Sequence, residues 1–189
     1  MANADAPRGF IPRRHKNGAP YSGACKRYYV ASGESNDLFI GDPVDLSGSG
    51  DAAGVPGVQQ PAGQNVIGVI VGVENLTSDN LSRTYRPAST AMYVMVADDP
   101  DLEFEIQEDS TGGALAAADI GLNADFVIGT GDTTFGTSAA EIDSSTKATT
   151  ATLGLRILEL AQREDNEIGT NANWLVKFNL HRHNNATGA

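Results

Sequence analysis

The segment YRPASTAMYVMVADDPDLEFEIQED, residues 85–109, decides the predicted fold because it contains two stretches of strand-forming sequence. The first, residues 91–97, is rich in aromatic, β-branched and long apolar side chains, which pack well on a pleated sheet. The second, residues 102–107, alternates strictly between apolar and polar side chains. The aspartates and proline of residues 98–101 are typical of a turn. We interpret the segment as a β-hairpin that keeps its carboxylates in water and buries Leu102, Phe104 and Ile106.

Shorter strand patterns flank this segment on both sides, each bounded by turn-forming residues. The expected strands are residues 26–31, 37–44, 65–74, 124–128, 135–142, 153–160 and 174–180. Residues 46–63 are expected to form a long exposed loop, and residues 110–119 one or two helical turns. Twenty-one glycines and eight prolines suit so many turns. The predicted fold is therefore all-β, a single-domain β-barrel or β-sandwich with an extended N-terminal arm.

The composition is typical of a folded, soluble protein. A chain of 189 residues with 40% hydrophobic and 20% charged residues can bury one substantial core. A single cysteine, Cys25, excludes an intrachain disulfide framework. No apolar run reaches the roughly 18 residues of a membrane span, so no membrane contact is expected. The first residues lack the apolar segment of a signal peptide, and folding in a cytosol is expected.

Charge divides the chain into a basic start and an acidic remainder. Of the net charge of −11, residues 1–30 contribute +5 and residues 31–155 contribute −16, while the rest is balanced. This asymmetry predicts an extended basic arm (residues 1–25), a β-rich body (26–183) and a frayed tail (184–189). An acidic body repels phosphates, so no direct nucleic-acid binding is expected.

The arm is the candidate interface. Its prolines and glycines prevent regular structure, yet apolar and aromatic side chains interleave its charges. A solvated tail, the simpler interpretation, has no need of such groups. We therefore expect the arm to lie against an acidic surface of a neighbouring copy or a partner. The residues expected at this interface are Arg8, Phe10, Arg13, Arg14, Lys16 and Tyr21.

No residue pattern indicates an enzyme or a cofactor site. His181 and His183 lie at the end of the last predicted strand, where their spacing would place both imidazoles on one face. Two ligands make no metal site, and a solvated strand end is the better interpretation. Cys25 has no adjacent base in the sequence to activate it. Residues 129–136, although rich in glycine, lack the spacing of a phosphate-binding loop and no helical pattern follows them.

The densest group of carboxylates begins directly after the first strand of the predicted hairpin and comprises Asp98, Asp99 and Asp101, with Glu103, Glu105, Glu108 and Asp109. Asp98, Asp99 and Asp101 offer the oxygen ligands that hard cations prefer. The ligand spacing of a helix–loop–helix calcium site is absent, so a solvated face is favoured and cation binding stays open.

Several stretches together resemble one family. They are GAPYSG (18–23), KRYYV (26–30), LFIGDPV (38–44), YRPAST (85–90), VADDPD (96–101), FEIQED (104–109), DNEIG (165–169) and WLVK (174–177). These stretches are similar to virion structural proteins of tailed bacteriophages, of the capsid decoration (cement, head-stabilising) type. The resemblance covers most of the chain except the region near residues 48–63.

The resemblance implies a non-enzymatic protein that binds the outer surface of the phage head and stabilises the lattice of the major capsid protein. It also implies a homo-oligomer, with a trimer favoured over a dimer, located on the capsid exterior after synthesis in the host cytoplasm. Two alternatives remain. One is a head–tail connector or tail subunit, and the other is a carbohydrate-binding adsorption module on the virion.

Overall fold

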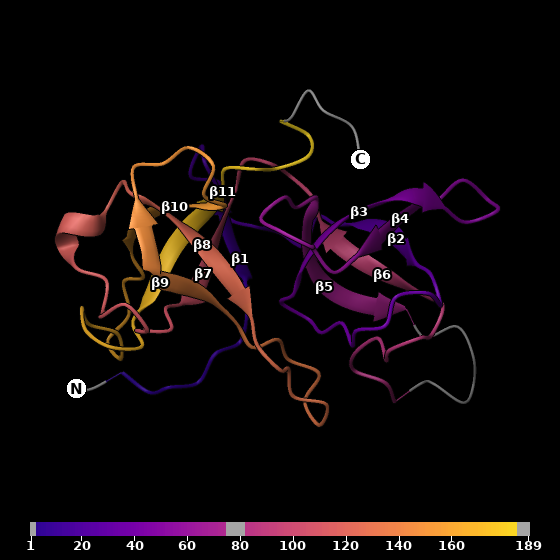
Figure 1. The fold of residues 1–189 in the computed structure, drawn as a ribbon, viewed down its shortest axis with the longest axis horizontal. Helices are drawn as coiled ribbons and strands as arrows, with labels where there is room; N and C mark the ends of the chain where they lie inside the picture. The colour runs from indigo at the N-terminus through magenta and orange to yellow at the C-terminus, as the bar shows by residue number, and fades with distance from the viewer. Residues whose placement is uncertain (1–2, 75–81, 185–189) are drawn as a thin grey trace.

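The computed structural model describes residues 3–74 and 82–184, and these ranges are almost entirely β (Figure 1). The strands are β1 (Ile11–His15), β2 (Lys26–Val30), β3 (Pro43–Gly50), β4 (Pro56–Gln59), β5 (Gly68–Glu74), β6 (Met92–Ala97), β7 (Leu102–Gln107), β8 (Asn123–Ile128), β9 (Ala140–Ala148), β10 (Leu155–Leu160) and β11 (Asn173–Phe178). A short 3-10 helix, η2 (Ala117–Asp119), precedes β8. The prediction of an all-β fold is confirmed. No helix in the described ranges is long and apolar enough to cross a membrane.

Two sheets lie side by side, where the sequence predicted a single barrel or sandwich (Figure 1). Six strands form the first in the order β1-β7-β11-β10-β8-β9, with antiparallel pairing throughout. Phe104, Trp174 and Leu155 lie in its core with exposures of 1% or less. The sheet curls around this core, so that Glu108, directly after β7, forms a parallel bridge with Ile142 of β9. We call this unit the sheet lobe.

Five strands form the second unit, a closed barrel in the order β2-β4-β3-β5-β6, in which β6 returns to β2. Only β2 and β4 run parallel; the other pairs are antiparallel. Val30, Leu38 and Val94 are fully buried in its core. The loop predicted for residues 46–63 is wrong in part, because β3 and β4 pair there. The serines and glycines of β3 show no apolar alternation, so its sequence gave little sign of a strand.

The hairpin predicted for residues 91–107 is wrong in its pairing, although both strands exist. β6 pairs with β2 and β5 in the barrel, whereas β7 pairs with β1 and β11 in the sheet lobe. Residues 98–101 therefore connect the two lobes. Asp98 accepts hydrogen bonds from Nζ of Lys26 at 2.7 Å and Oη of Tyr28 at 2.8 Å, which hold the connection against β2. Alternation fixes the buried face of a strand, not its partner.

The first residues belong to the sheet lobe, and the predicted division into an extended arm and a body at residue 25 is corrected. β1 is a strand of the sheet, and the Phe10 side chain is 1% exposed within the core. The N–H of Phe10 donates to the carbonyl of Gly41 at 2.9 Å. Gly9, with φ of +68°, lies so close to Gly41 and Ser138 that any side chain on it would collide with them. Residues 185–189 of the predicted tail lie outside the described residues.

The two cores meet along the segment that enters β5. Val66 and Val69 belong to the core of the sheet lobe, while Ile67 and Ile70 belong to the barrel core, so both faces of this segment are buried. Leu102, Phe104 and Ile106 are buried as predicted. Val69 and Leu155 are buried as well, and Val71 is half-buried against the sheet-lobe core.

Candidate interaction surface

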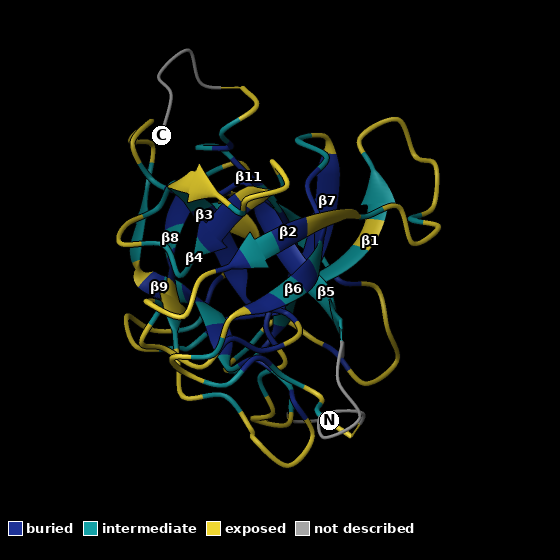
Figure 2. Ribbon diagram, turned by 90° about the vertical axis from the view of Figure 1, so that its right-hand side faces the viewer, coloured by how far each residue is buried: buried dark blue, intermediate teal, exposed yellow. Residues whose placement is uncertain are grey.

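The outer face of β7 carries two glutamates that the sequence placed in water, and arginines cover both. Glu103 and Glu105 are only 8% and 3% exposed. Nε of Arg14 donates to Glu103 at 2.6 Å, and Nε of Arg13 donates to Glu105 at 2.8 Å. Arg163, between β10 and β11, adds an ion pair with Glu105 at 2.7 Å. Figure 2 shows β7 as buried, beside the intermediate and exposed β1. The predicted solvated face is therefore wrong.

The six predicted interface residues occupy different environments. Phe10 cannot fill a pocket of a partner, because it lies inside the core of its own chain against Phe104, Phe126 and Phe178. The other five are Arg8, Arg13, Arg14, Lys16 and Tyr21. The two arginines of β1 are bound to glutamates of β7, and the tyrosine is half-buried against the sheet-lobe core. The two remaining cations are exposed and form no ion pair within the described ranges.

The most exposed large apolar side chain of the described ranges is Phe135, which is 73% exposed. It lies in the loop of residues 129–139 that connects β8 to β9 and projects beyond both sheets in Figure 1. The sequence assigned Phe135 to the start of a strand, whereas the strand begins at Ala140. A large aromatic group held in water costs solvation free energy, so its exposure marks the loop tip as a candidate contact.

Hydrogen bonds hold the Phe135 loop in one conformation. Oδ1 of Asp132 accepts the N–H groups of Thr134 at 2.7 Å and Phe135 at 3.2 Å. The N–H of Asp132 donates to Thr137 at 2.8 Å, and the N–H of Gly136 donates back to the Asp132 carbonyl at 2.7 Å. These bonds fix the backbone on both sides of the aromatic ring, so the loop presents Phe135 without further ordering.

The same loop is fastened to residues outside it. Gly131 lies against the ring of Phe39, where a Cβ would collide with the ring. The N–H of Ile40 donates to the Gly136 carbonyl at 3.0 Å, and the N–H of Ser138 donates to the Ile40 carbonyl at 2.9 Å. Ile40 is itself 37% exposed, so a second apolar group lies beside the loop base.

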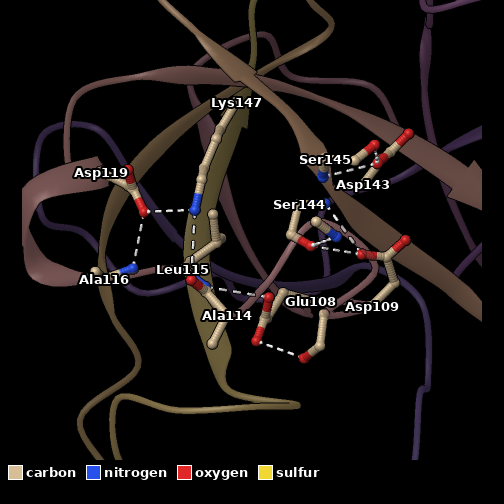
Figure 3. A network of polar contacts seen from close by, with 12 residues as sticks. Glu108, Asp109, Ala114, Leu115, Ala116, Asp119, Asp143, Ser144, Ser145 and Lys147 are labelled. Carbon is tan, nitrogen blue, oxygen red and sulfur yellow. Dashed lines mark hydrogen bonds and ion pairs between the residues drawn. The ribbon is translucent and has the colours of Figure 1, made fainter.

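A group of acids at the end of β7 is satisfied by donors of the chain itself (Figure 3). Oδ1 of Asp109 accepts the N–H of Ser144 at 3.0 Å and its hydroxyl at 2.9 Å. Burial alone would raise the pKa of Asp109, but these bonds and those from Thr111 hold it below its usual value. Glu108 accepts the hydroxyl of Ser110 at 2.9 Å, and burial raises its pKa. The network fastens the end of β7 to β9.

The histidines and the carboxylates between β6 and β7 lie at the junction of the lobes. His181 is 1% exposed, and burial lowers its pKa to about 4. Nε2 of His183 lies 3.4 Å from Asp98, and Nδ1 of His15 lies 3.1 Å from Asp99. Side chains of the protein thus already contact two of the carboxylates considered for a cation. No group of three or more His, Cys, Asp or Glu residues in the described ranges is arranged to hold a metal ion.

Comparison of the chain with protein-family models, with curated proteins and with solved structures gives no match. The site is therefore interpreted from its own geometry.

The sequence analysis did not identify Phe135 or Arg163 as functional residues. The signal for Phe135 is an aromatic residue inside a Gly/Thr/Asp turn segment, GTGDTTFGT, where a short loop needs no apolar group. Nothing in the sequence indicates that Arg163 reaches Glu105.

Proposed function

We propose that this protein is a non-enzymatic capsid decoration protein, which binds the outer surface of a phage head and stabilises the lattice of the major capsid protein. The resemblance described above is one support. The structural observation that best supports the proposal is the hydrogen-bonded loop, which holds the Phe135 side chain 73% exposed. Aromatic side chains dominate the binding energy of protein interfaces, and a fixed loop loses little conformational entropy on binding.

The lattice would be stabilised by mass action. A protein that binds assembled capsid subunits, and not free ones, lowers the free energy of the shell by its own binding free energy. The loop suits such a role because its tip projects away from both hydrophobic cores, so binding requires no rearrangement of either lobe (Figure 1).

Co-sedimentation with shells assembled from the major capsid protein of the same phage tests the proposal. The wild-type chain should sediment with shells and should ignore unassembled capsid subunits. Phe135→Ser should weaken shell binding by about tenfold or more, since loss of an interface aromatic commonly costs over 1 kcal/mol. Because the Phe135 side chain is largely exposed, the melting temperature of the Phe135→Ser variant should stay close to that of the wild type.

Ile168→Ser is the matched control. Ile168 is also an exposed apolar residue, at 48%, but lies on the separate loop between β10 and β11. Its replacement should leave shell binding unchanged. Equal losses of shell binding in the two variants would indicate non-specific apolar adhesion. Wild-type shell binding by Phe135→Ser would show that the loop does not contact the capsid.

The two alternative functions give other outcomes. A head–tail connector or tail subunit would be present in about a dozen copies per particle and would not bind closed shells over their whole surface.

For a carbohydrate-binding module, the half-exposed rings of Tyr29 and Tyr93, 5.4 Å apart on the barrel, are the best stacking surface. The guanidinium of Arg27 already lies 3.6 Å over the Tyr93 ring, which leaves less of it for a sugar. Glycan binding lost in Tyr29→Ala would support this second function.

A further inference from the structure

A cleft of about 340 Å³ lies between the N-terminal residues and the rest of the sheet lobe, and its lining shares no residue with the Phe135 loop. Its floor is formed by β7 and β11, through Glu105, Gln107 and Asn173. One wall is the segment of residues 3–13, and the other is the loop between β10 and β11. Its lining includes three guanidinium groups, which is unusual for a chain with a net charge of −11.

The wall formed by the first residues is fixed by side-chain amides. Gln107 accepts the N–H of Ala6 at 3.0 Å and donates to the carbonyls of Ala4 and Asn171, each at 2.8 Å. Asn3 donates to the carbonyl of Thr170 at 3.0 Å and so reaches the opposite wall. The cleft is therefore formed before any ligand arrives.

Glu105 orients two of the arginines. This carboxylate is 3% exposed, accepts Nε of Arg13 at 2.8 Å and forms an ion pair with Nη1 of Arg163 at 2.7 Å. Nε of Arg163 also lies 3.1 Å from the exposed carboxylate of Asp165. Arg13 is thus held through Nε alone, whereas Arg163 is held through Nε and Nη1, so the nitrogens left for another acceptor are the two terminal ones of Arg13 and Nη2 of Arg163.

Several donors of the cleft have no acceptor within the described part of the chain. They are both terminal nitrogens of Arg13, Nη2 of Arg163 and the whole guanidinium of Arg8, which forms no ion pair there. Counted with Glu105 and Asp165, the charged groups of the cleft sum to +1. Planar guanidinium groups bind carboxylates through paired hydrogen bonds and are less strongly hydrated than ammonium groups.

We infer that this cleft binds the carboxylates of an acidic segment of a partner protein. Arg8 is the main contact, because its whole guanidinium is available to the ligand. The assignment concerns a second contact surface and goes beyond capsid decoration through Phe135. It would stand if the chain bound no capsid at all.

Titration of the full chain with a blocked hexaglutamate peptide at low salt tests the inference. The readout is the ¹⁵N NMR signal of the arginine Nε–H groups, together with the dissociation constant. Signals of Arg8, Arg13 and Arg163 should shift. Arg8→Gln should weaken binding about fivefold, the loss expected for one exposed charge-assisted interaction, and physiological salt should weaken wild-type binding.

Arg156→Gln is the matched control because it removes the same charge outside the cleft, where Nε of Arg156 donates to Oδ1 of Asn123 at 2.8 Å. It should bind the peptide as the wild type does, and so should Phe135→Ser. Equal binding by Arg8→Gln and the wild type, or equal losses in Arg8→Gln and Arg156→Gln, would overturn the inference. Tighter binding of inorganic phosphate than of the peptide would also overturn the inference. So would self-association of the wild-type chain that Arg8→Gln abolishes, because the occupant of the cleft would then be a second copy of this chain.

Discussion

The ring of Phe10 meets the ring of Phe104 edge to face, with centroids 6.0 Å apart and ring planes at 89°. Aromatic pairs favour this geometry because the positive edge of one ring faces the negative face of the other. Phe10 also contacts Phe126 and Phe178, so residues from four segments of the chain meet at one point of the core. The N-terminal residues are thus a part of the fold that the rest of the sheet lobe requires.

Removal of the Phe10 ring should therefore destabilise the protein. Phe10→Ala should lower the free energy of unfolding by about 3–5 kcal/mol, the usual cost of deleting a buried phenylalanine ring. Deletion of residues 1–17, which also removes β1, should abolish cooperative unfolding of the sheet lobe. Urea unfolding followed by the fluorescence of buried Trp174 measures both. Lys16→Ala, at an exposed position, should stay within roughly 0.5 kcal/mol. A truncated chain with an unchanged melting temperature would show that the N-terminus is only an arm.

Arg86 should be as important for stability as an aromatic core residue. Its side chain is fully buried and donates to the carbonyls of Ala31, Glu34, Asn36 and Thr90 at 2.7–3.0 Å. Arg86→Ala would remove the side-chain donor of the Asn36 and Thr90 carbonyls, whereas those of Ala31 and Glu34 still accept the N–H groups of Glu34 and Ser89. Each buried polar group left unsatisfied costs about 1–3 kcal/mol. We expect a loss of at least 3 kcal/mol in urea unfolding, and Arg86→Lys should recover only part of it because lysine lacks the planar fork. A loss below 1 kcal/mol, no larger than in Arg156→Ala, would contradict this role.

Asp42 should make the stability depend on pH. Burial raises the pKa of Asp42 to about 6, although its carboxylate accepts the N–H of Phe39 at 2.7 Å. The folded state then binds this proton more tightly than the unfolded state. Its contribution to stability is therefore greatest below about pH 4 and is lost as the pH rises towards 6, by up to about 3 kcal/mol.

The comparison with Asp42→Asn isolates this group, because asparagine has no charge to bury and keeps an acceptor for Phe39. Unfolding free energies of the two proteins should diverge between pH 4 and 7, with the wild type losing more stability. Other groups with shifted pKa values, such as Glu141 (raised to about 7 by burial) and His181, affect both proteins equally. Parallel stability curves over this range would mean that Asp42 titrates normally.

The sequence predicted the strands better than their partners. Alternation at residues 102–107 correctly placed Leu102, Phe104 and Ile106 in the core, because a strand's period depends only on local residues. The pairing of β6 with β2 and of β7 with β1 depends on contacts between distant segments, and a proline-containing acidic turn is as compatible with a lobe connection as with a hairpin. Burial of Glu103 and Glu105 likewise depends on Arg14 and Arg13, which lie about ninety residues earlier.

The candidate interface could be predicted only in part. The sequence pointed to the basic residues of the first segment, and Arg8 and Arg13 do line the cleft. It also pointed to Phe10, because the prolines and glycines of this segment prevent it from building a core of its own. That segment instead completes the core of another part of the chain. Exposure of Phe135 follows from the hydrogen bonds of Asp132 and the contact of Gly131 with Phe39, which no local pattern encodes.

Cryo-microscopy of intact phage particles that carry this chain tests the central proposal most directly. We expect density for both lobes on the outside of the head, in copy numbers comparable with the major capsid protein, and with the Phe135 loop in contact with a capsid subunit. Density confined to about a dozen copies at the head–tail junction, or density on the capsid in which Phe135 faces solvent, would contradict the proposed function or its proposed contact, respectively.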